Sequence, residues 1–585
     1  MKKKRLYAAL LATVMVLTAC GSEPVVKESQ PAQTETANTT TSNSEEVVES
    51  QYPEYLNLEG PYPIVKDEYA DDITLSAVIV MQDNAGDWED LWINKYFQGK
   101  YNVNLDVEYL TYSNMDERTS LMLNSGELPD IMINLGITNA EIMKYGVSEG
   151  LFLQLDQYMN ETLTPNILTY FEGKAAQDCT APDGHVYTLP NMSEPQYSWN
   201  VKRLFINNKW LADLNLELPK TLDDFVDVMY KIKEADPAGV GSENLYPFGG
   251  GDKEGTGNAW YILNALGYLD SKTTNGDGYG VTPHLRDGEV VIPVYDMDVY
   301  QEYLKIMNQF YTDGIINPTF FTIEETEMNA QMVEGKTAMY HTAPYLSGIT
   351  NQEDWVSVYP LTSAWQTEPE IGAYSYATPG NFLVSADTEY PELCLRFADL
   401  FYNNVTDYAN AIQGSTCEPE HYYGMVHAHW DEEKNNTQIK LPEGIASNWQ
   451  YQVEYKIGNV WSFGAATTFE ASEKMAEGFG HPEYVKEDNG QNKGNNIWAN
   501  SVFTNMKPYA DADGFPLNYY ATEETINRIL ELETVIQPYA SEQIALFITG
   551  RRPLSETEDF IKELEGLGIE DLLNIYKEVY ADYNK

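Results

Sequence analysis

Apolar residues that follow one another without interruption mark the first predicted strand. Ile73–Met81 reads ITLSAVIVM and is rich in β-branched residues, which is typical of a strand buried on both faces of a parallel sheet. Residues 82–110 then read as a loop, a helix and a second strand, and Asp130–Ile133 follows a further helix as another strand. This βαβ order predicts an α/β lobe in which the loop after the first strand lies at the carboxyl edge of the sheet, where such folds bind ligands.

Other segments repeat apolar residues three and four positions apart, which is the spacing of a helix that buries one face. The clearest case begins at Thr221, which stands three residues before Asp224 in a capping-box-like pair. Its apolar stripe should belong to the core and consists of Leu222, Phe225, Val226, Met229 and Ile232. Near the C-terminus, Ser555 stands three residues before Glu558 in a second capping-box-like pair. Two helices follow, and they are separated near Gly566 and Gly568.

The first residues have the pattern of an export signal. The cationic head Met1–Arg5 precedes fourteen mostly apolar residues, Leu6–Ala19, which are too few to span a bilayer as a mature helix. We therefore expect residues 1–19 to be a signal peptide. Leu17–Cys20 resembles the lipobox of bacterial lipoproteins, in which the chain is cut before the cysteine and the thiol is lipidated, here that of Cys20. The alternative is an ordinary cleavage site followed by a cysteine by chance.

A polar segment follows this cysteine. Gly21–Ser50 is rich in Ser, Thr, Glu and Gln and has no aromatic residue, so it cannot bury a core. We assign residues 20–70 to the lipidated Cys20 and a disordered tether. No second apolar run approaches the length of a membrane span, and the lipid is therefore expected to be the only anchor, on the extracellular face of the cytoplasmic membrane.

The length and charge of the chain limit its organisation and its partners. At 585 residues it is too long for one ordinary core, and two lobes are the simplest prediction. Without the basic residues of the signal, 32 basic residues remain against 90 acidic ones, a net charge of −58. Such a chain is repelled by nucleic acid, polyphosphate and acidic glycans, so neutral or cationic partners are favoured and nucleic acid is not expected.

Cysteines and aromatic residues add two further indications. Apart from Cys20, the chain has Cys179, Cys394 and Cys417, without a CxxC spacing or nearby histidine pairs, so neither a zinc site nor a disulfide framework is predicted. A single disulfide among these three stays open. The chain contains 43 Tyr and 11 Trp against 19 Phe, an excess that suits surfaces that are apolar on one side and wet on the other, such as carbohydrate grooves.

No sequence pattern supports an enzyme. GVSEG, at Gly146–Gly150, has the letters of a nucleophile elbow but lacks the strand that must precede it. EGKT, at Glu334–Thr337, ends like a phosphate loop, but Ala330 stands where the first glycine of such a loop must be. Counting carboxylates does not exclude a glycosidase-like pair, because such a pair is defined by separation in space. We expect a non-enzymatic protein without a cofactor.

Several segments together resemble the extracellular solute-binding proteins of family 1, which are the lipoprotein components of bacterial ABC importers. They occur in the family's order and span nearly the whole mature chain. The segments are Leu-Thr-Ala-Cys, LMLNSGELPDIM, RLFINNKWLADLNLELPKTLDDFVDVMYKIKEADP, VEGKTAMYHTAPYL, GNFLVSADTEYPELCLRFADLFYN and FITGRRPLSETEDFIKELEGLGIEDLLNIYKEVYADY.

This resemblance implies a two-lobed α/β fold of the periplasmic-binding type, type II-like, with hinge strands, an interlobe ligand cleft and C-terminal helices. Residues 71–195 with 376–425 are assigned to lobe one, and residues 196–375 with 426–585 to lobe two. The family's usual cargo is carbohydrate, here expected to be a neutral oligosaccharide that the lipoprotein delivers to the transmembrane permease subunits of an ABC transporter. A monomer is expected.

One departure from the family concerns a loop suited to calcium in many relatives. Such a loop presents oxygen ligands at alternating positions. This chain has DPAGVGSENLYPF, with Ala238 and Val240 where Asp or Asn would be wanted. Asp236, Glu243 and Asn244 remain as weak calcium candidates, and no metal is expected.

Ligand contacts are expected on loops that leave the ends of strands. A pyranose offers apolar faces to aromatic rings and a rim of hydroxyls to Asp, Asn, Glu or Arg. The candidates are Asp83, Asp87, Trp88 and Asn134 on lobe one, Tyr197 and Trp199 between the lobes, and Asp252, Asn258, Trp260, Tyr261, His341 and Tyr345 on lobe two. Trp199, Trp260 and Tyr345 are favoured because relatives place cleft residues there. For every aromatic candidate, core packing is the competing interpretation.

Two alternatives stay open. A binding protein of the same fold for peptide or another small solute predicts fewer paired aromatic residues and more charged groups in the cleft. A surface lipoprotein that hydrolyses glycans predicts a carboxylate pair a few ångströms apart and turnover of the bound sugar.

Overall fold

The computed structural model describes most of one compact unit that begins at Tyr52. The signal peptide, Cys20 and residues 20–51 of the expected tether lie outside the described residues. The described residues are 52–60, 62–81, 86–111, 113–193, 203–251, 257–271, 279–341, 349, 351–372, 377–402, 428–431, 436–439, 456, 466–467, 501–502, 504–510 and 512–584.

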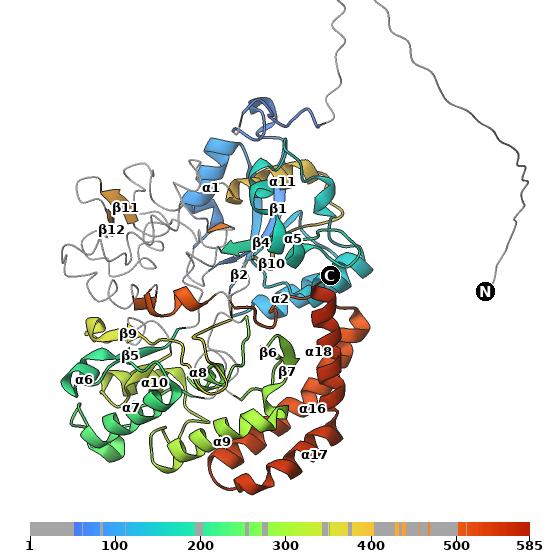
Figure 1. The fold of residues 1–585 in the computed structure, drawn as a ribbon. Coiled ribbons are helices and arrows are strands. Elements are labelled where there is room, and N and C mark those ends of the chain that lie inside the picture. Colours follow the sequence, from blue (N-terminus) through green and yellow to red (C-terminus); the bar gives the residue numbers. More distant parts are fainter. Residues whose placement is uncertain are drawn as a thin grey trace, which may run out of the picture. The chain divides into compact units, whose positions relative to one another are not determined.

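The first lobe is built on a six-stranded mixed sheet with the order β13-β4-β10-β3-β1-β2 (Figure 1). Strand β1 runs parallel to β2 and β3, whereas β10 runs antiparallel to β3 and β4. The predicted α/β fold is therefore confirmed. The bounds are Thr74–Met81 (β1), Asn104–Thr111 (β2), Ile131–Ile133 (β3), Leu189–Ser193 (β4), Ala377–Val384 (β10) and Ala466–Thr467 (β13).

Both faces of this sheet are covered, which explains the uninterrupted apolar run of β1. Ile79 and its neighbours at alternate positions pack into one core cluster, and Val78 and Val80 pack into another on the opposite face. The first cluster includes residues of α1 (Trp92–Tyr96), α4 (Pro165–Tyr170), α5 (Gly173–Cys179) and α11 (Pro391–Asp399), and the second includes residues of α2 (Met115–Ser125). Cys179 and Cys394 are buried free thiols in the first cluster.

The aspartate of the SGELPD segment holds three parts of this lobe together. The Asp130 carboxylate accepts hydrogen bonds from the backbone N–H of Ser76 at 2.8 Å and from its hydroxyl at 2.7 Å. The hydroxyl of Thr388 donates to the other carboxylate oxygen at 2.6 Å. Asp130 thus joins β1, the start of β3 and the loop after β10, because a carboxylate can accept several donors at once.

Residues that were assigned to the end of the tether belong to the first lobe. Leu56, Ile64 and Val65 are buried in its core, and the backbone N–H of Ile64 donates to the carbonyl of Tyr101 at 2.9 Å. The prediction of a tether that reaches residue 70 is therefore wrong at its C-terminal end. Residues 52–70 contain four tyrosines as well as Leu56, Leu58, Ile64 and Val65, so the polar composition ends near Ser50 and the folded part begins there.

The second lobe carries a smaller sheet of short strands, in the order β8-β5-β9 (Figure 1). Strand β5 (Phe205–Asn207) is antiparallel to both β8 (Met339–Tyr340) and β9 (Trp355–Ser357). Hairpin β6-β7 (His284–Arg286 and Glu289–Val291) forms a separate pair. The helices of this lobe are α6 (Asn208–Asp213), α7 (Leu222–Ala235), α8 (Trp260–Ala265), α9 (Met297–Thr312) and α10 (Glu325–Val333).

Helix α7 agrees with the sequence prediction. The Thr221 hydroxyl accepts a hydrogen bond from the backbone N–H of Asp224 at 3.1 Å and so caps the helix. The predicted stripe faces the core, except that Val228 is buried where Val226 is only partly buried. The helical spacing alone therefore found the buried face to within one side chain.

Three C-terminal helices complete the core of the second lobe: α16 (Glu523–Ile548), α17 (Thr557–Leu567) and α18 (Ile569–Tyr583). They share one apolar cluster with α9, and the Asn308 side chain donates to the carbonyls of Phe547 and Ile548 at 3.0 and 3.1 Å. The predicted break falls at Gly568, whose φ of 95° suits glycine and whose added Cβ would lie 2.9 Å from Leu532. Among the described residues, no helix combines the length and apolar character needed to cross a bilayer.

One segment departs from the expected division into lobes. Strand β13 pairs in parallel with β4 and so belongs to the first sheet, although residues 426–585 were all assigned to the second lobe. A second hairpin in this part of the chain consists of β11 (Ala428–Asp431) and β12 (Asn436–Ile439).

Candidate functional site

The carboxyl ends of several parallel strands lie at one edge of the first sheet, here named the first edge. Strands β1 and β3 are parallel and end there, and β4 ends beside the start of β10, since Met192 pairs with Ala377. The described candidates Asp87 and Asn134 follow β1 and β3, so the topology gives them the same edge. In sheets of this kind, ligands bind outside the carboxyl ends of parallel strands.

A corresponding edge of the second sheet, here named the second edge, is where β5 begins and where β8 and β9 end. Phe205, the first residue of β5, pairs with both Tyr340 and Ser357. His341 directly follows β8 at this edge. Residues 247–251, here named the glycine-rich loop, run beside β8, because the backbone N–H of Ala338 donates to the carbonyl of Pro247 at 3.0 Å.

The two edges are joined by the segments that pass between the lobes. Strand β4 leads from the first edge into β5 at the second edge, and the chain after β9 returns to β10. A third segment, residues 509–520, bonds to both sides: the carbonyl of Tyr509 accepts from the N–H of Ile371 at 2.8 Å, and the Asn518 side chain donates to the carbonyl of Ala377 at 3.0 Å. Each segment therefore connects the strand ends that carry the candidate residues.

On the first edge the structure separates the candidates. Asp87 is exposed, and Asn134 is half-buried at the end of β3 with a φ of 59°, its backbone N–H donating to the carbonyl of Asn381 at 2.7 Å. Trp88 is buried in the first-lobe core, and its indole N–H donates to the carbonyl of Leu105 at 3.2 Å. Both the ring and the polar atom of Trp88 are thus used in packing, as the competing interpretation expects, and a ligand contact at Trp88 stays a prediction.

The glycine-rich loop of the second lobe is closed by Asn258. This residue is fully buried, and its side-chain amide donates to the carbonyl of Phe248 at 2.7 Å, while its Oδ1 has no hydrogen-bond partner among the described residues. Gly249 and Gly250 have positive φ values, and a Cβ on Gly250 would lie 2.8 Å from the Asn258 side chain. Only glycine allows this close approach of the loop to Asn258.

Trp260 and Tyr261 begin the buried helix α8 and belong to the core. Tyr261 has no exposed surface, packs edge-on against Phe225 at 5.3 Å between ring centroids, and donates its hydroxyl to the carbonyl of Tyr359. Trp260 is 2% exposed and packs against Tyr261. Both rings therefore lie in the core, as the competing interpretation expects, and their contact with a ligand stays a prediction.

His341 is buried at the second edge, with its ring centroid 4.8 Å from that of Tyr340. Burial lowers the pKa of His341 to about 4, because desolvation disfavours the charged imidazolium. The side chain is therefore neutral at pH 7 and offers one donor and one acceptor nitrogen.

The remaining ligand candidates lie outside the described residues. They are Asp83, Tyr197, Trp199, Asp252 and Tyr345.

The weak calcium candidates are exposed or engaged within their own loop. The two carboxylate oxygens of Asp236 accept backbone N–H groups of Val240 at 3.1 Å and Gly241 at 2.8 Å. Glu243 is exposed, and the Asn244 side chain donates to the Val240 carbonyl at 2.9 Å. Across the described part of the chain, no group of three or more His, Cys, Asp or Glu side chains is placed to hold a metal ion.

Sequence reasoning missed the contribution of residues 501–507 to the second edge. The backbone N–H of Ser357 donates to the Ser501 hydroxyl at 2.6 Å, and the Asn505 side chain donates to the Ser357 carbonyl at 2.7 Å. Lys507 is half-buried beyond them, and burial lowers its pKa to about 8. These partners are more than 140 residues apart in the chain, so no local pattern could have revealed them.

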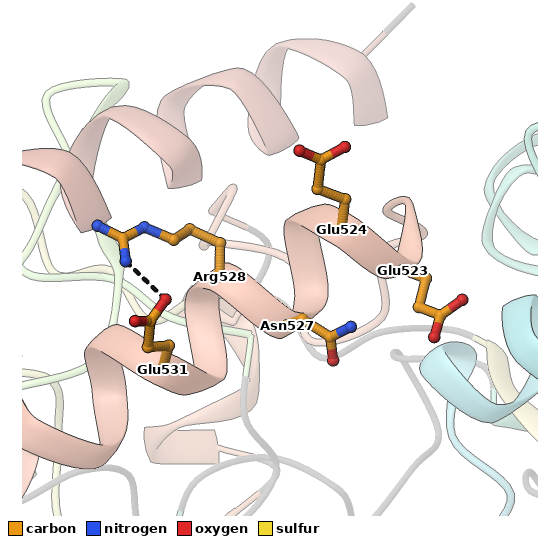
Figure 2. A pocket seen from close by; sticks show the side chains of 5 residues that line it. All are labelled: Glu523, Glu524, Asn527, Arg528 and Glu531. Carbon is orange, nitrogen blue, oxygen red and sulfur yellow. Dashed lines mark hydrogen bonds and ion pairs between the residues drawn. The ribbon is translucent and has the colours of Figure 1, made fainter.

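A pocket of about 630 Å³ lies elsewhere, along the first turns of α16, and is lined by Glu523, Glu524, Asn527, Arg528 and Glu531. Figure 2 shows that all five side chains project from this one helix and that Arg528 turns toward Glu531. Arg528 also pairs with Asp571 of α18 at 2.6 Å. The lining has no aromatic ring, and its only cation is already paired, so the pocket lacks the chemistry expected for a sugar site.

Comparison with known proteins gives a consistent result. A family model described as bacterial extracellular solute-binding protein matches residues 82–409. The fructooligosaccharide ABC transporter substrate-binding protein FusA of Streptococcus pneumoniae is 23% identical over 505 residues, which cover 82% of this chain and 84% of that protein.

Solved structures share the fold at low sequence identity. The FusA complex with kestose superimposes with a TM-score of 0.61 at 20% identity, covering 88% of this chain and 99% of the other. A solute-binding protein of Bifidobacterium longum infantis, described as an HMO-binding, ABC-transporter-associated protein, gives a TM-score of 0.66 at 18% identity, covering 88% of this chain and 99% of the other.

Proposed function

Because the chain belongs to the bacterial extracellular solute-binding protein family, we propose that it captures an oligosaccharide outside the cell and delivers it to the permease subunits of an ABC transporter. The family consists of solute-binding proteins, so the expectation of a non-enzymatic protein is confirmed. The alternative of a glycan-hydrolysing lipoprotein is set aside on the same ground.

The observation that carries this proposal is the topology of the two edges. Strand β4 leads along the chain into β5, and the chain after β9 returns to β10, so the paired strand ends of two separate sheets are joined by the same connecting segments. A solute held between two such edges is contacted by both lobes only when the lobes close on it. This arrangement suits reversible capture and release.

The choice of carbohydrate rests on the chemistry of the candidates and on the relatives. FusA is named for fructooligosaccharide, and YtcQ of Bacillus subtilis, 23% identical over 239 residues, for polygalacturonan and rhamnogalacturonan. The net charge of −58 argues against a polyanionic cargo for this chain and favours a neutral oligosaccharide. Peptide or another small solute is the second candidate.

Polar groups of both edges are proposed to bind the hydroxyl rim of the sugar. Asn134 serves the first edge together with Asp87, and Asn258 and His341 serve the second. The unpartnered Oδ1 of Asn258 is an acceptor for which a donor such as a sugar hydroxyl would be favourable, because a buried polar atom without a partner is costly. The aromatic surfaces are proposed to come from Tyr197, Trp199 and Tyr345, with Asp83 and Asp252 as further polar contacts.

The location is part of the same proposal. Cleavage before Cys20 and lipidation of its thiol would hold the protein on the extracellular face of the cytoplasmic membrane, with the segment after Cys20 as a tether. Two acyl chains suffice for stable anchoring, whereas one alone gives only marginal binding.

The direct test is calorimetry of neutral oligosaccharides against the chain in which Cys20 is replaced by serine. Binding of at least one glycan is expected, without any change in the glycan after prolonged incubation. Asn258→Ala should weaken that binding about tenfold, the cost of one lost buried hydrogen bond. Asn244→Ala, an exposed residue of the same lobe, is the matched control. If no glycan bound at millimolar concentration and a peptide did, the second candidate would replace the first.

A further inference from the structure

The end of helix α18 crosses from the second lobe to the first. Ile569, Leu572, Tyr576 and Val579 bury this helix in the second-lobe core. Its last residue, Tyr583, instead donates its hydroxyl to the Asp178 carboxylate at 2.7 Å, and the Gln177 side chain donates to the Tyr583 carbonyl. Asp178 and Gln177 belong to α5, whose Ala175 and Cys179 lie in the first-lobe core.

A connecting segment reaches the same end of α5. The Tyr520 hydroxyl donates to the carbonyl of Cys179 at 3.4 Å, and the Tyr520 ring packs against the first-lobe cluster that includes Leu383 and Tyr187. The Asn139 side chain donates to the carbonyl of Tyr519 at 3.2 Å. Three consecutive residues, Gln177 to Cys179, therefore hold both the third segment between the lobes and the last residue of α18.

The contact between Tyr583 and Asp178 is buried and joins a neutral hydroxyl to a carboxylate. Asp178 is 1% exposed, and burial raises the pKa of Tyr583, whose hydroxyl is therefore protonated and able to donate. A hydrogen bond to a carboxylate is stronger than one between neutral groups. Removing the donor would leave a buried carboxylate with fewer partners, which is costly.

We propose that Tyr583 and Asp178 are a positioning pair for solute binding, which ties the C-terminal helix to the first lobe beside a connecting segment and confines the rotation of one lobe against the other. A contact beside the connecting segments moves little when the lobes rotate, so it can persist through opening and closing. With rotation confined, the two edges approach each other in one orientation, and less orientational freedom is lost when a solute is bound. The role in binding rests on the proposed function, whereas the restraint itself does not.

The test measures the distance between the lobes without any ligand. Spin labels are placed at two exposed positions, Leu121 on α2 of the first lobe and Val333 on α10 of the second, in the full chain with Cys20 and Cys417 replaced by serine. The buried thiols of Cys179 and Cys394 stay unlabelled. The parent protein should give one narrow distance distribution by electron double resonance, and Tyr583→Phe should broaden it.

Two further variants keep the result interpretable. Tyr580→Phe, one turn earlier on α18 with its ring stacked on Phe515, should leave the distribution narrow. Gln177→Ala changes an exposed side chain and removes its hydrogen bond to the Tyr583 carbonyl. It should broaden the distance distribution even if Tyr583→Phe does not fold. An unchanged distribution in a folded Tyr583→Phe variant, or in Gln177→Ala where Tyr583→Phe does not fold, would overturn the proposal.

Affinity provides the second readout. For whichever solute binds the parent protein, Tyr583→Phe should weaken binding about tenfold, because orientational freedom that the bond removes beforehand would then be lost on binding. Equal affinity of parent and variant would refute the positioning role. Because the distance measurement needs no ligand, failure of the oligosaccharide assignment would leave the restraint itself testable.

Discussion

The two lobes are stabilised in different ways. The first is organised by its sheet: β1 pairs along all eight residues with β2 and is buried on both faces. The second has strands of only two or three residues and is held by helices around aromatic side chains, with Phe225 in ring contact with Phe248, Tyr261 and Phe310. The site is therefore expected to have one wall fixed by backbone hydrogen bonds and one wall fixed by side-chain packing.

The largest fall in the free energy of unfolding is expected from a substitution in the aromatic core of the second lobe. Phe225→Ala should lower the free energy of unfolding by about 3–5 kcal/mol, because it removes a fully buried ring and leaves a cavity. Hydrogen exchange should show lost protection in α7 and α9 and little change in β1.

The matched variant in the first lobe is Ile79→Ala, at a fully buried position of β1. It should cost about 2–5 kcal/mol and raise exchange in β1, β2 and β3 instead. If both variants raised exchange equally in both lobes, the two cores would form a single cooperative unit and the distinction drawn above would be wrong.

A smaller effect is a pH dependence of stability that is expected in the first lobe. Burial raises the pKa of Asp399 to about 6, although its carboxylate accepts the N–H groups of Asn166 and Ile167 at 2.9 and 2.8 Å. The folded first lobe therefore binds this proton more tightly than the unfolded chain. The contribution of Asp399 is most favourable below about pH 4 and is lost as the pH rises to about 6, by about 3 kcal/mol in total.

Denaturant unfolding between pH 4 and 7 measures this contribution. Asp399→Asn should flatten the dependence of the free energy of unfolding on pH. Asp387→Asn, a change at an exposed position of the same lobe, should give the same slope as the parent protein. The same slope in Asp399→Asn as in the parent would show that another group is responsible.

The sequence predicted what local pattern determines. Strand β1 was found because an uninterrupted apolar, β-branched run is typical of a strand buried on both faces, and helix α7 because its apolar residues recur with a period of 3.6. The βαβ order also indicated which strand ends coincide, as the parallel pairing of β1 with β2 and β3 shows. The choice between ligand contact and core packing for Trp88 and Trp260 could not be made from the sequence, because an aromatic residue in a loop and one in a core look alike there.

The burial of those two rings depends on distant partners. Trp88 is fixed by a carbonyl of β2, and Trp260 packs in a cluster that draws on α7, α9 and the C-terminal helices. The same holds for Leu56 and Val65, whose partners in the first-lobe core come from distant parts of the chain. Long-range contacts of this kind have no signature in a single sequence.

The smallest effect examines how far the second lobe depends on individual helices. Thr221→Ala removes the hydroxyl that caps α7 and should lower the free energy of unfolding by about 1 kcal/mol, whereas Thr221→Ser keeps the oxygen and should lie within a few tenths of a kcal/mol of the parent. If helices stabilise this lobe independently of its short strands, faster exchange should be confined to the first turn of α7. If Thr221→Ser lowered the free energy of unfolding as much as Thr221→Ala, the lost methyl group would matter more than the cap. Packing rather than capping would then set the stability of this wall of the site.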